Sequence, residues 1–195
     1  AAVGLSTETI TVSEGTYEEN LIVNKPNLTI EGPNVGIDPC TGSRVGEAIV
    51  SPPVGFPASV SVLLDLGNAN GVTIDGLTFD GLSRADLDAI WVYDANDVSI
   101  QNNIINDFVR TWGIVFWSTG AGLTGNMIQN NQIKDLPNAG SRGVGLLQNG
   151  YASVLNNCFE NVDYGVQTNN MYLAGNPEEI SGNTFQTLNL AVYIN

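Results

Sequence analysis

The stretch Ile128-Gln129-Asn130-Asn131-Gln132-Ile133 decides the fold, because related stretches recur along the chain at nearly one period. The large apolar residue that closes each unit returns every 26 to 28 residues, as Phe79, Ile105, Ile133, Phe159 and Phe185. From the second unit on, an Asn stands two positions before it, as Asn103, Asn131, Asn157 and Asn183. Apolar triplets such as Ile114-Val115-Phe116 precede each unit. The chain is therefore an internal repeat of short, strand-like segments.

A repeat of this length, with turns rich in Gly, Asn and Asp, is too short and too strand-like for a pair of helices. It fits the stacked coils of a β-solenoid, in which equivalent residues of successive coils lie about 4.8 Å apart. The apolar columns then fill the tube. An Asn column is tolerated inside because each amide can donate to one neighbour and accept from the other. We predict one all-β domain over residues 1–195 with about six to seven coils.

Residues 33–59 interrupt the period and hold five of the chain's 8 prolines, Pro33, Pro39, Pro52, Pro53 and Pro57. We interpret this segment as a Pro/Gly-rich insertion that leaves the tube as a side loop. Two roles are open for it. In the first, the segment only runs over one sheet, and we favour this role because the segment holds no cluster of reactive groups. In the second, the segment forms the wall of a binding cleft.

The formal net charge of −14, from 20 acidic and 6 basic residues, argues against nucleic acid and anionic membrane surfaces as partners. No apolar run approaches the roughly 20 residues of a membrane span, so we expect no membrane insertion. Polycations, calcium and neutral glycans remain as candidate partners.

The start of the chain and its cysteines bear on location. The chain begins at Ala1 without an initiator Met, which suits a secreted or cell-surface protein after signal-peptide removal and equally a piece of a longer protein. A disulfide between Cys40 and Cys158 needs Cα atoms within about 7 Å. The insertion that holds Cys40 would have to run several strand spacings along the tube to reach Cys158. We therefore expect two free thiols.

Two stretches carry a resemblance to a known family. The opening segment VSEGTYEENLIVNKPNLTIEG (12–32) resembles the first coil of the pectin-lyase-like right-handed parallel β-helices, and GIVFWSTGAGLTGNMIQNNQI (113–133) is similar to their later repeats. The resemblance implies a single-stranded right-handed parallel β-helix. It implies no one function, because the superfamily includes pectate lyases, pectin esterases, polygalacturonases, phage tailspikes and non-catalytic surface proteins.

The catalytic motifs that the resemblance to these enzymes would imply are absent from the chain. It has no His, no Gly-Asp-Phe-Ile-Phe-Gly stretch and no Arg-x-Pro-x-x-Arg element. The residues that remain as catalytic candidates share one turn, Arg84, Asp86 and Asp88, and the candidate calcium ligands Asp107 and Asp135 stack in a column. We favour the interpretation that all are solvated turn residues. If the protein is an enzyme, we expect a polysaccharide lyase or glycoside hydrolase, with calcium as the one cofactor to consider.

The clearest functional signal is apolar and faces outward. Alternation that puts Ile90, Val92, Ile114 and Phe116 inside puts Trp91, Tyr93, Val115 and Trp117 outside on neighbouring coils, with Leu63 and Leu147 extending the strip. Exposed apolar strips mark interaction sites, and aromatic rows suit the flat faces of sugar rings. The competing interpretation is that the 33–59 insertion covers this sheet.

Together these observations predict a non-catalytic extracellular structural or adhesive module. It would associate with copies of itself, or with a larger parent chain, through the open ends of the solenoid, or contact a glycan through the aromatic strip. The alternative is a polysaccharide-active enzyme, either a calcium-dependent lyase or a hydrolase, that acts on an acidic glycan.

Overall fold

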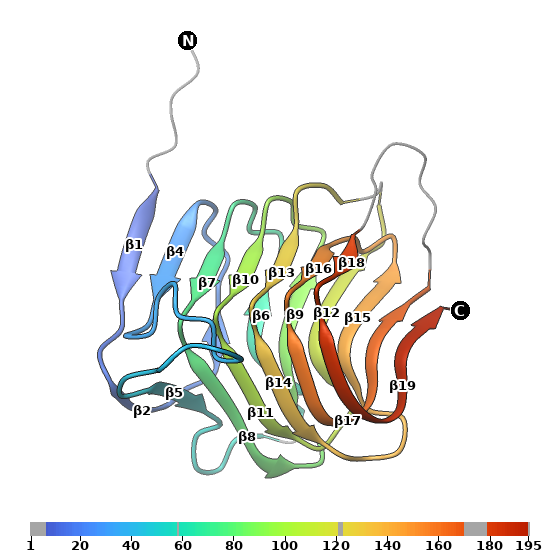
Figure 1. Ribbon diagram of the computed structural model, residues 1–195. Helices are drawn as coiled ribbons and strands as arrows, with labels where there is room; N and C mark the ends of the chain where they lie inside the picture. The colour runs from blue at the N-terminus through green and yellow to red at the C-terminus, as the bar shows by residue number, and fades with distance from the viewer. Residues whose placement is uncertain (1–6, 58, 121–122, 170–178, 195) are drawn as a thin grey trace.

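The computed structural model describes residues 7–57, 59–120, 123–169 and 179–194, with the side chain of Leu188 excepted. These residues form nineteen strands and no helix, and hence none of them forms a helix with the length and hydropathy of a membrane span. Figure 1 shows the strands wound into successive coils along one axis. The all-β parallel solenoid predicted from the repeat is confirmed.

The first sheet holds one strand from each of seven coils, all parallel. Its strands are β1 (Glu8–Thr11), β4 (Leu28–Glu31), β7 (Thr73–Asp75), β10 (Ser99–Gln101), β13 (Met127–Gln129), β16 (Ser153–Leu155) and β18 (Ile180–Ser181). Seven strands in this sheet agree with the predicted six to seven coils.

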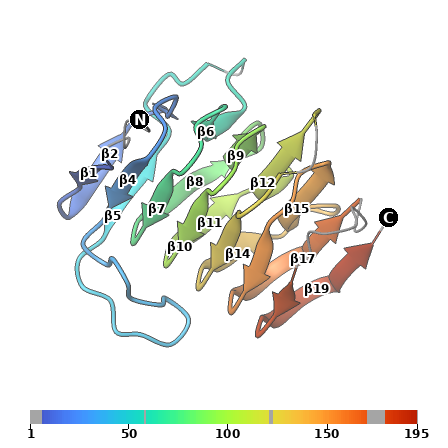
Figure 2. The same cartoon turned by 90° about the horizontal axis from the view of Figure 1, so that it is seen from above.

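The second sheet bends into two arms, which the view along another direction separates clearly (Figure 2). Its first arm contains β2 (Gly15–Glu18), β5 (Ala48–Ser51), β8 (Thr78–Arg84), β11 (Ile104–Phe108) and β14 (Gln132–Leu136). Its second arm contains β3 (Leu21–Ile22), β6 (Val62–Leu66), β9 (Asp88–Tyr93), β12 (Trp112–Ser118) and β15 (Arg142–Gln148). Two long strands, β17 (Cys158–Thr168) and β19 (Thr184–Ile194), run through both arms.

The apolar column of the repeat is a stack inside the tube. Strand register aligns its members in order, Phe79, Ile105, Ile133, Phe159 and Phe185. The first four are buried, and the rings of Phe159 and Phe185 stack with centroids 4.9 Å apart. Parallel pairing thus turns a sequence period into a continuous hydrophobic core.

The Asn column is a hydrogen-bonded ladder, as predicted. The side-chain amide of Asn131 donates to Asn157 Oδ1 at 3.0 Å and to the Ile100 carbonyl at 2.8 Å. Its Oδ1 accepts the backbone N–H of Asn103 at 3.0 Å. Asn103 and Asn157 repeat this pattern, so that each rung satisfies backbone groups at the corner between the two sheets.

The predicted insertion at 33–59 is two loops separated by a strand. Strand β5 pairs with β2 on one side and β8 on the other, and its Ala48 and Val50 are buried. The period is therefore kept at this level. Only the flanking loops leave the coil, and we call the first of them, residues 33–47, the strap.

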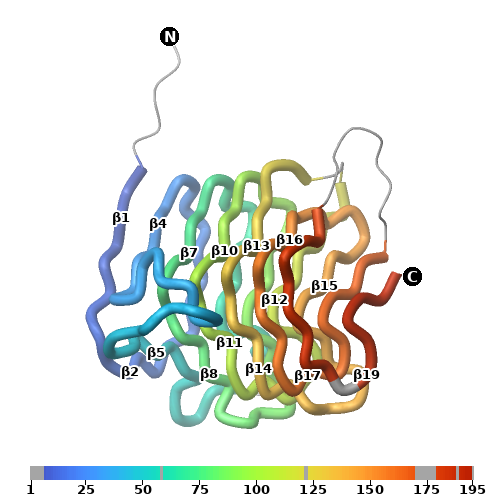
Figure 3. The backbone as a smooth tube through the Cα atoms, in the orientation of Figure 1, coloured from blue at the N-terminus to red at the C-terminus, as the bar shows by residue number. Residues whose placement is uncertain are grey.

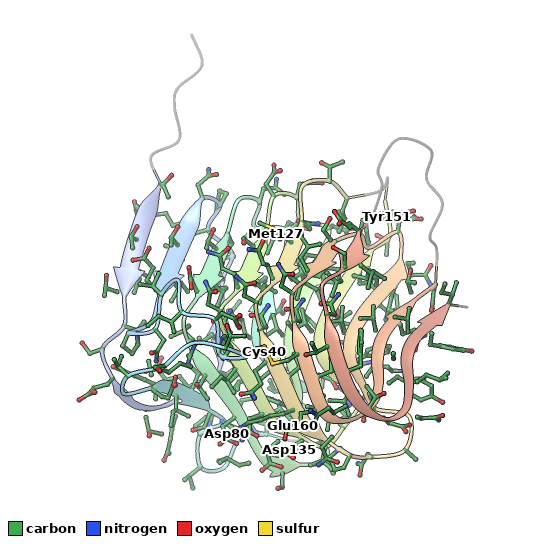
Figure 4. All side chains as sticks on the ribbon, viewed as in Figure 1. Cys40, Asp80, Met127, Asp135, Tyr151 and Glu160 are labelled. Atoms are coloured by element: carbon green, nitrogen blue, oxygen red, sulfur yellow. A yellow bond between two sulfur atoms is a disulfide. The ribbon has the colours of Figure 1, made fainter. Side chains whose placement is uncertain are left out.

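The strap runs along the solenoid, and this makes the expectation of two free thiols wrong. Cys40 and Cys158 form a disulfide with Cα atoms 5.9 Å apart. About 19 Å separates coils four spacings apart, and the eight residues that follow Gly32 can reach farther than that. Figure 3 shows the strap extending along the solenoid across successive coils, and Figure 4 labels Cys40, whose Sγ lies 3.5 Å from the carbonyl oxygen of Asn131, just before β14.

A largely buried cation, Arg44, also holds the strap in place. The Arg44 guanidinium donates to the carbonyls of Ile37 at 3.1 Å and Asn102 at 2.8 Å, and pairs with Glu47 at 2.7 Å. The sequence contained no signal for these partners, because they depend on where a proline-rich loop lies. The disulfide indicates folding in an oxidising environment.

The ladder generates a stability prediction. Replacing Asn131 by Ala leaves buried backbone groups of Asn103 and Ile100 without partners, so we expect a loss of about 3 kcal/mol in the free energy of unfolding. Asn183→Ala is the matched control, because Asn183 is half-buried and its removal should cost about 1 kcal/mol. Urea unfolding measures both. Equal losses for the two variants would contradict the buried-ladder account.

Candidate functional site

Three aromatic side chains gather on the outer face of the second arm. Trp91 and Tyr93 alternate with the core residue Val92 on β9, and Trp117 lies beside Tyr93 on β12. The rings of Trp91 and Tyr93 have centroids 5.2 Å apart, and those of Trp91 and Trp117 stack at 6.1 Å. All three are half-buried, so one part of each ring is packed and the other faces solvent. We call these three residues the aromatic platform.

The other three residues of the predicted strip do not reach the surface. Leu63 and Val115 are 0% exposed and Leu147 is 7% exposed, so the expectation that they line an exposed strip is wrong. Val115 lies in register between Trp91 and Gly145, and the Trp112 ring lies directly against Gly145. Val115 therefore lies among larger aromatic residues of the same face, and Leu63 belongs to the hydrophobic core.

The strap does not cover the platform. Its contacts include Asn102, which precedes β11, and Cys158 at the start of β17, both at the corner between the first sheet and the first arm. The aromatic platform belongs to the second arm. The competing interpretation of the insertion as a cover therefore fails for the strap.

An ion pair between the buried Asp88 and the exposed Arg110 lies beside the platform. The Asp88 side chain, 1% exposed, accepts a hydrogen bond from Arg110 Nη1 at 2.8 Å and from the backbone N–H groups of Thr111 and Trp112. Burial raises the pKa of the Asp88 carboxyl, against the opposing effect of these donors. The Trp91 ring N–H lies close enough to the Asp88 carboxyl to lower its pKa. The two groups do not meet the geometry of a hydrogen bond, so that Trp91 Nε1 has no hydrogen-bond acceptor among the described residues.

Two polar atoms at the platform have no hydrogen-bond partner among the described residues, Asp65 Oδ1 and Trp91 Nε1. Asp65 and Trp91 are neighbours in register across β6 and β9. Burial raises the pKa of the Asp65 carboxyl, and burial followed by the carboxylates of Asp65 and Asp88 raises the pKa of the Tyr93 hydroxyl. An acceptor and a donor that the fold leaves unused thus lie next to three aromatic rings.

The turn that sequence analysis singled out does not form one site. Arg84 and Asp86 pair with each other at 2.7 Å, and Arg84 lies over the Phe56 ring at 5.1 Å. Asp88 takes Arg110 as its partner. Arg110 lies just before β12 on the next coil, so its pairing with Asp88 depends on how adjacent coils stack.

The candidate calcium ligands lie within strands, Asp107 in β11 and Asp135 in β14, each with a positive φ, 62° and 56°. Asp107 accepts a hydrogen bond from Ser83 Oγ, and Asp135 accepts one from Asn161 Nδ2 at 2.8 Å. Figure 4 shows Asp135 at the lower edge of the coils. No group of three or more His, Cys, Asp or Glu side chains that could hold a metal ion occurs in the described part of the chain. Asp107 and Asp135 stay a prediction without structural support.

The fold and its repeat define a parallel β-helix. Residues 62–195 match the family described as right handed beta helix region, and the chain belongs to this family. Among solved structures it is similar to pectin methylesterase PemA from Erwinia chrysanthemi, with 13% identity and a TM-score of 0.45 over 89% of this chain and 49% of that chain. A mutant pectin methylesterase in complex with hexasaccharide IV gives 12% identity and a TM-score of 0.44 over 87% of this chain and 72% of that one.

The chain spans about half the length of the first of these proteins, 49%. No curated protein matches it. The family match establishes the family and the β-helix architecture, and it says nothing about activity.

The Asp65 environment predicts a pH-dependent stability. Because its pKa in the folded protein is raised above the ordinary 3.8, ionisation of Asp65 costs stability as the pH rises from 3.8 through the folded-state pKa. Asp65→Asn should therefore match wild type near pH 3 and exceed it at pH 7, by less than about 1 kcal/mol because the side chain is partly solvated.

Thermal unfolding at the two pH values measures this difference. Asp86→Asn is a control of opposite sign, since Arg84 lowers the pKa of the Asp86 carboxyl and its charge is favourable at neutral pH. If Asp65→Asn is the less stable protein at pH 7, the Asp65 carboxylate has a favourable partner in the folded state and this description of the site is wrong.

Proposed function

We propose that this protein is a non-catalytic, extracellular carbohydrate-contacting module that binds its glycan on the aromatic platform. The observation that carries the proposal is the cluster of Trp91, Tyr93 and Trp117 with ring centroids 5.2 and 6.1 Å apart, each ring half-buried and half-exposed. Rigid aromatic rings supported from below offer flat apolar faces to the apolar faces of sugar rings.

The unpartnered polar atoms support a polar ligand over a purely apolar one. A buried donor or acceptor without a partner costs about 1–3 kcal/mol, and Trp91 Nε1 and Asp65 Oδ1 both lie beside the platform in this state. A sugar presents an apolar ring face together with hydroxyl groups that can both donate and accept. Asp65 as a whole is half-buried, so a hydroxyl of the ligand can approach the solvent-facing side of its carboxyl group.

A secreted or cell-surface location fits the same proposal. The Cys40–Cys158 disulfide indicates an oxidising environment, in which extracellular glycans are found. The net charge of −14 keeps such a module away from nucleic acid and anionic membranes.

A polysaccharide-active enzyme is the second candidate, and the raised pKa values of Asp65 and Asp88 favour it. Carboxyls with raised pKa values beside a binding surface are what general acid and base catalysis requires. Against it, the Asp88 carboxylate already accepts hydrogen bonds from Arg110 and from two backbone N–H groups. Release of reducing or unsaturated ends from a bound polysaccharide would select the enzyme over the module.

The platform proposal predicts the effect of aromatic substitutions on glycan retention. In affinity electrophoresis against a panel of neutral, acidic and amine-bearing polysaccharides, Trp91→Ala and Trp117→Ala should each weaken retention about 10-fold or more. Tyr17→Ala is the matched control, since Tyr17 is a half-exposed aromatic residue on β2 in the other arm, and it should bind like wild type. Retention of none of the panel by wild type, or unchanged retention by both Trp variants, would refute the platform.

The exposed strand edges favour association as part of the same extracellular role. Within the described residues, β1 pairs with β4 alone and β19 with β17 alone. Apolar side chains at these two ends are exposed, namely Ile10, Ile22, Leu190, Val192 and Ile194. Unpaired strand edges with exposed apolar residues are templates for pairing with another chain.

We expect this chain to associate with itself in a concentration-dependent way, as measured by sedimentation velocity. Ile194→Lys places a charge on the β19 edge, where Ile194 is 63% exposed, and should weaken association at least several-fold. Lys substitution at Val54, which is 93% exposed in the loop after β5, is the control and should have no effect. A protein that stays monomeric over the whole concentration range would contradict this part of the proposal.

A further inference from the structure

The charges around the aromatic platform are not balanced. Arg110 is the cation beside the platform, and its partner is Asp88. Asp65 has no ion pair or side-chain hydrogen bond among the described residues, and one of its oxygens is buried without a partner. Its neighbours in register are Ile22 and Trp91, both uncharged. The platform therefore carries a carboxylate, that of Asp65, with no ionic or hydrogen-bonding partner in the described structure.

We infer that the ligand of the platform is an amine-bearing glycan, a polymer of amino sugars whose protonated amines pair with the Asp65 carboxylate. This inference rests on the proposed function and names its ligand class. An ammonium group over the faces of Trp91 or Tyr93 is also attracted by the negative faces of the rings. One carboxylate beside several aromatic rings is thus complementary to a cation held close to an apolar sugar face.

Acidic and neutral glycans fit this arrangement less well. A polyuronate would bring further negative charge to an uncompensated carboxylate on a protein of net charge −14. A neutral glycan can accept the Trp91 N–H and donate hydroxyls to Asp65, but it would bury the carboxylate further without neutralising it, which is costly. An amino sugar meets both needs, since its hydroxyls can accept the hydrogen bond from the Trp91 N–H and its ammonium group can neutralise the Asp65 carboxylate.

The fold accepts a cost for this carboxylate that a structural role does not explain. Ionised Asp65 is desolvated without a partner, so the charge is unfavourable for folding. Polar groups that lower stability and face a binding surface are typical of functional positions. Removing the charge should therefore stabilise the protein while it weakens binding, a combination that a merely structural residue does not give.

The test compares two oligomers that share one backbone. A β-1,4-linked glucosamine hexamer carries protonated amines at mildly acid pH, whereas the N-acetylglucosamine hexamer carries no charge, and polygalacturonate is the acidic probe. In calorimetry at low ionic strength, wild type should bind the amine hexamer at least about 10-fold more tightly than the acetylated one. Asp65→Asn should abolish this preference while unfolding at the same or a higher temperature.

The matched control is Glu18→Gln, which removes one negative charge from an exposed position on β2 in the other arm. It should keep the preference for the amine hexamer. If Glu18→Gln lowers the preference as much as Asp65→Asn does, the attraction comes from net charge and the assignment to Asp65 is wrong.

The remaining outcomes separate this inference from the proposed function. If wild type and Asp65→Asn each bind the two hexamers equally well, the inference of an amine-bearing ligand is wrong. The proposal of a carbohydrate-contacting module then still stands. If polygalacturonate binds more tightly than the amine hexamer, the inference of an amine-bearing ligand is wrong in the same way. No binding of any probe overturns both.

Discussion

Parallel pairing between successive coils is the constraint on which the rest of this structure depends. It places equivalent residues about 4.8 Å apart along the axis, so that a column in the sequence becomes a column in space. Inside the tube this produces the stack from Phe79 to Phe185. At the corner it produces the Asn ladder, in which each amide satisfies the backbone of its neighbours. On the outer face it places Trp91 beside Trp117, and that surface follows from the same geometry as the core.

Features that follow from the repeat could be predicted from the sequence, whereas features outside the repeat could not. The apolar and Asn columns, the parallel coils and the outward direction of Trp91, Tyr93 and Trp117 all follow from a period near 26 residues and alternation within each strand. Strand β5 was missed because prolines follow it and a long loop precedes it. Its pairing with β2 and β8 is decided by tertiary contacts. The disulfide was missed for a related reason, since the direction in which residues 33–47 run is set by partners such as Asn102 that sequence does not pair.

Burial and charge pairing at the candidate site were also beyond sequence reasoning. Alternation gives the direction of Val115 but not the rings that surround it, so a residue predicted to be exposed is 0% exposed. Asp88 stands close to Arg84 and Asp86 in the sequence, yet its ion pair is with Arg110 on the next coil. The isolation of Asp65 is a property of the assembled face, because it depends on Ile22 and Trp91 being its neighbours in register.

The account's central claim is that the aromatic platform is the ligand-binding surface and that Asp65 selects the ligand. A crystal structure with the glucosamine hexamer tests it most directly. The account predicts a sugar ring over Trp91 or Trp117 and an amine nitrogen within about 2.7–3.2 Å of an Asp65 carboxylate oxygen. It would be contradicted by an oligomer bound elsewhere with the platform empty, for example in the groove beside Cys40 and Cys158 that Asn130, Asn156 and Glu160 line.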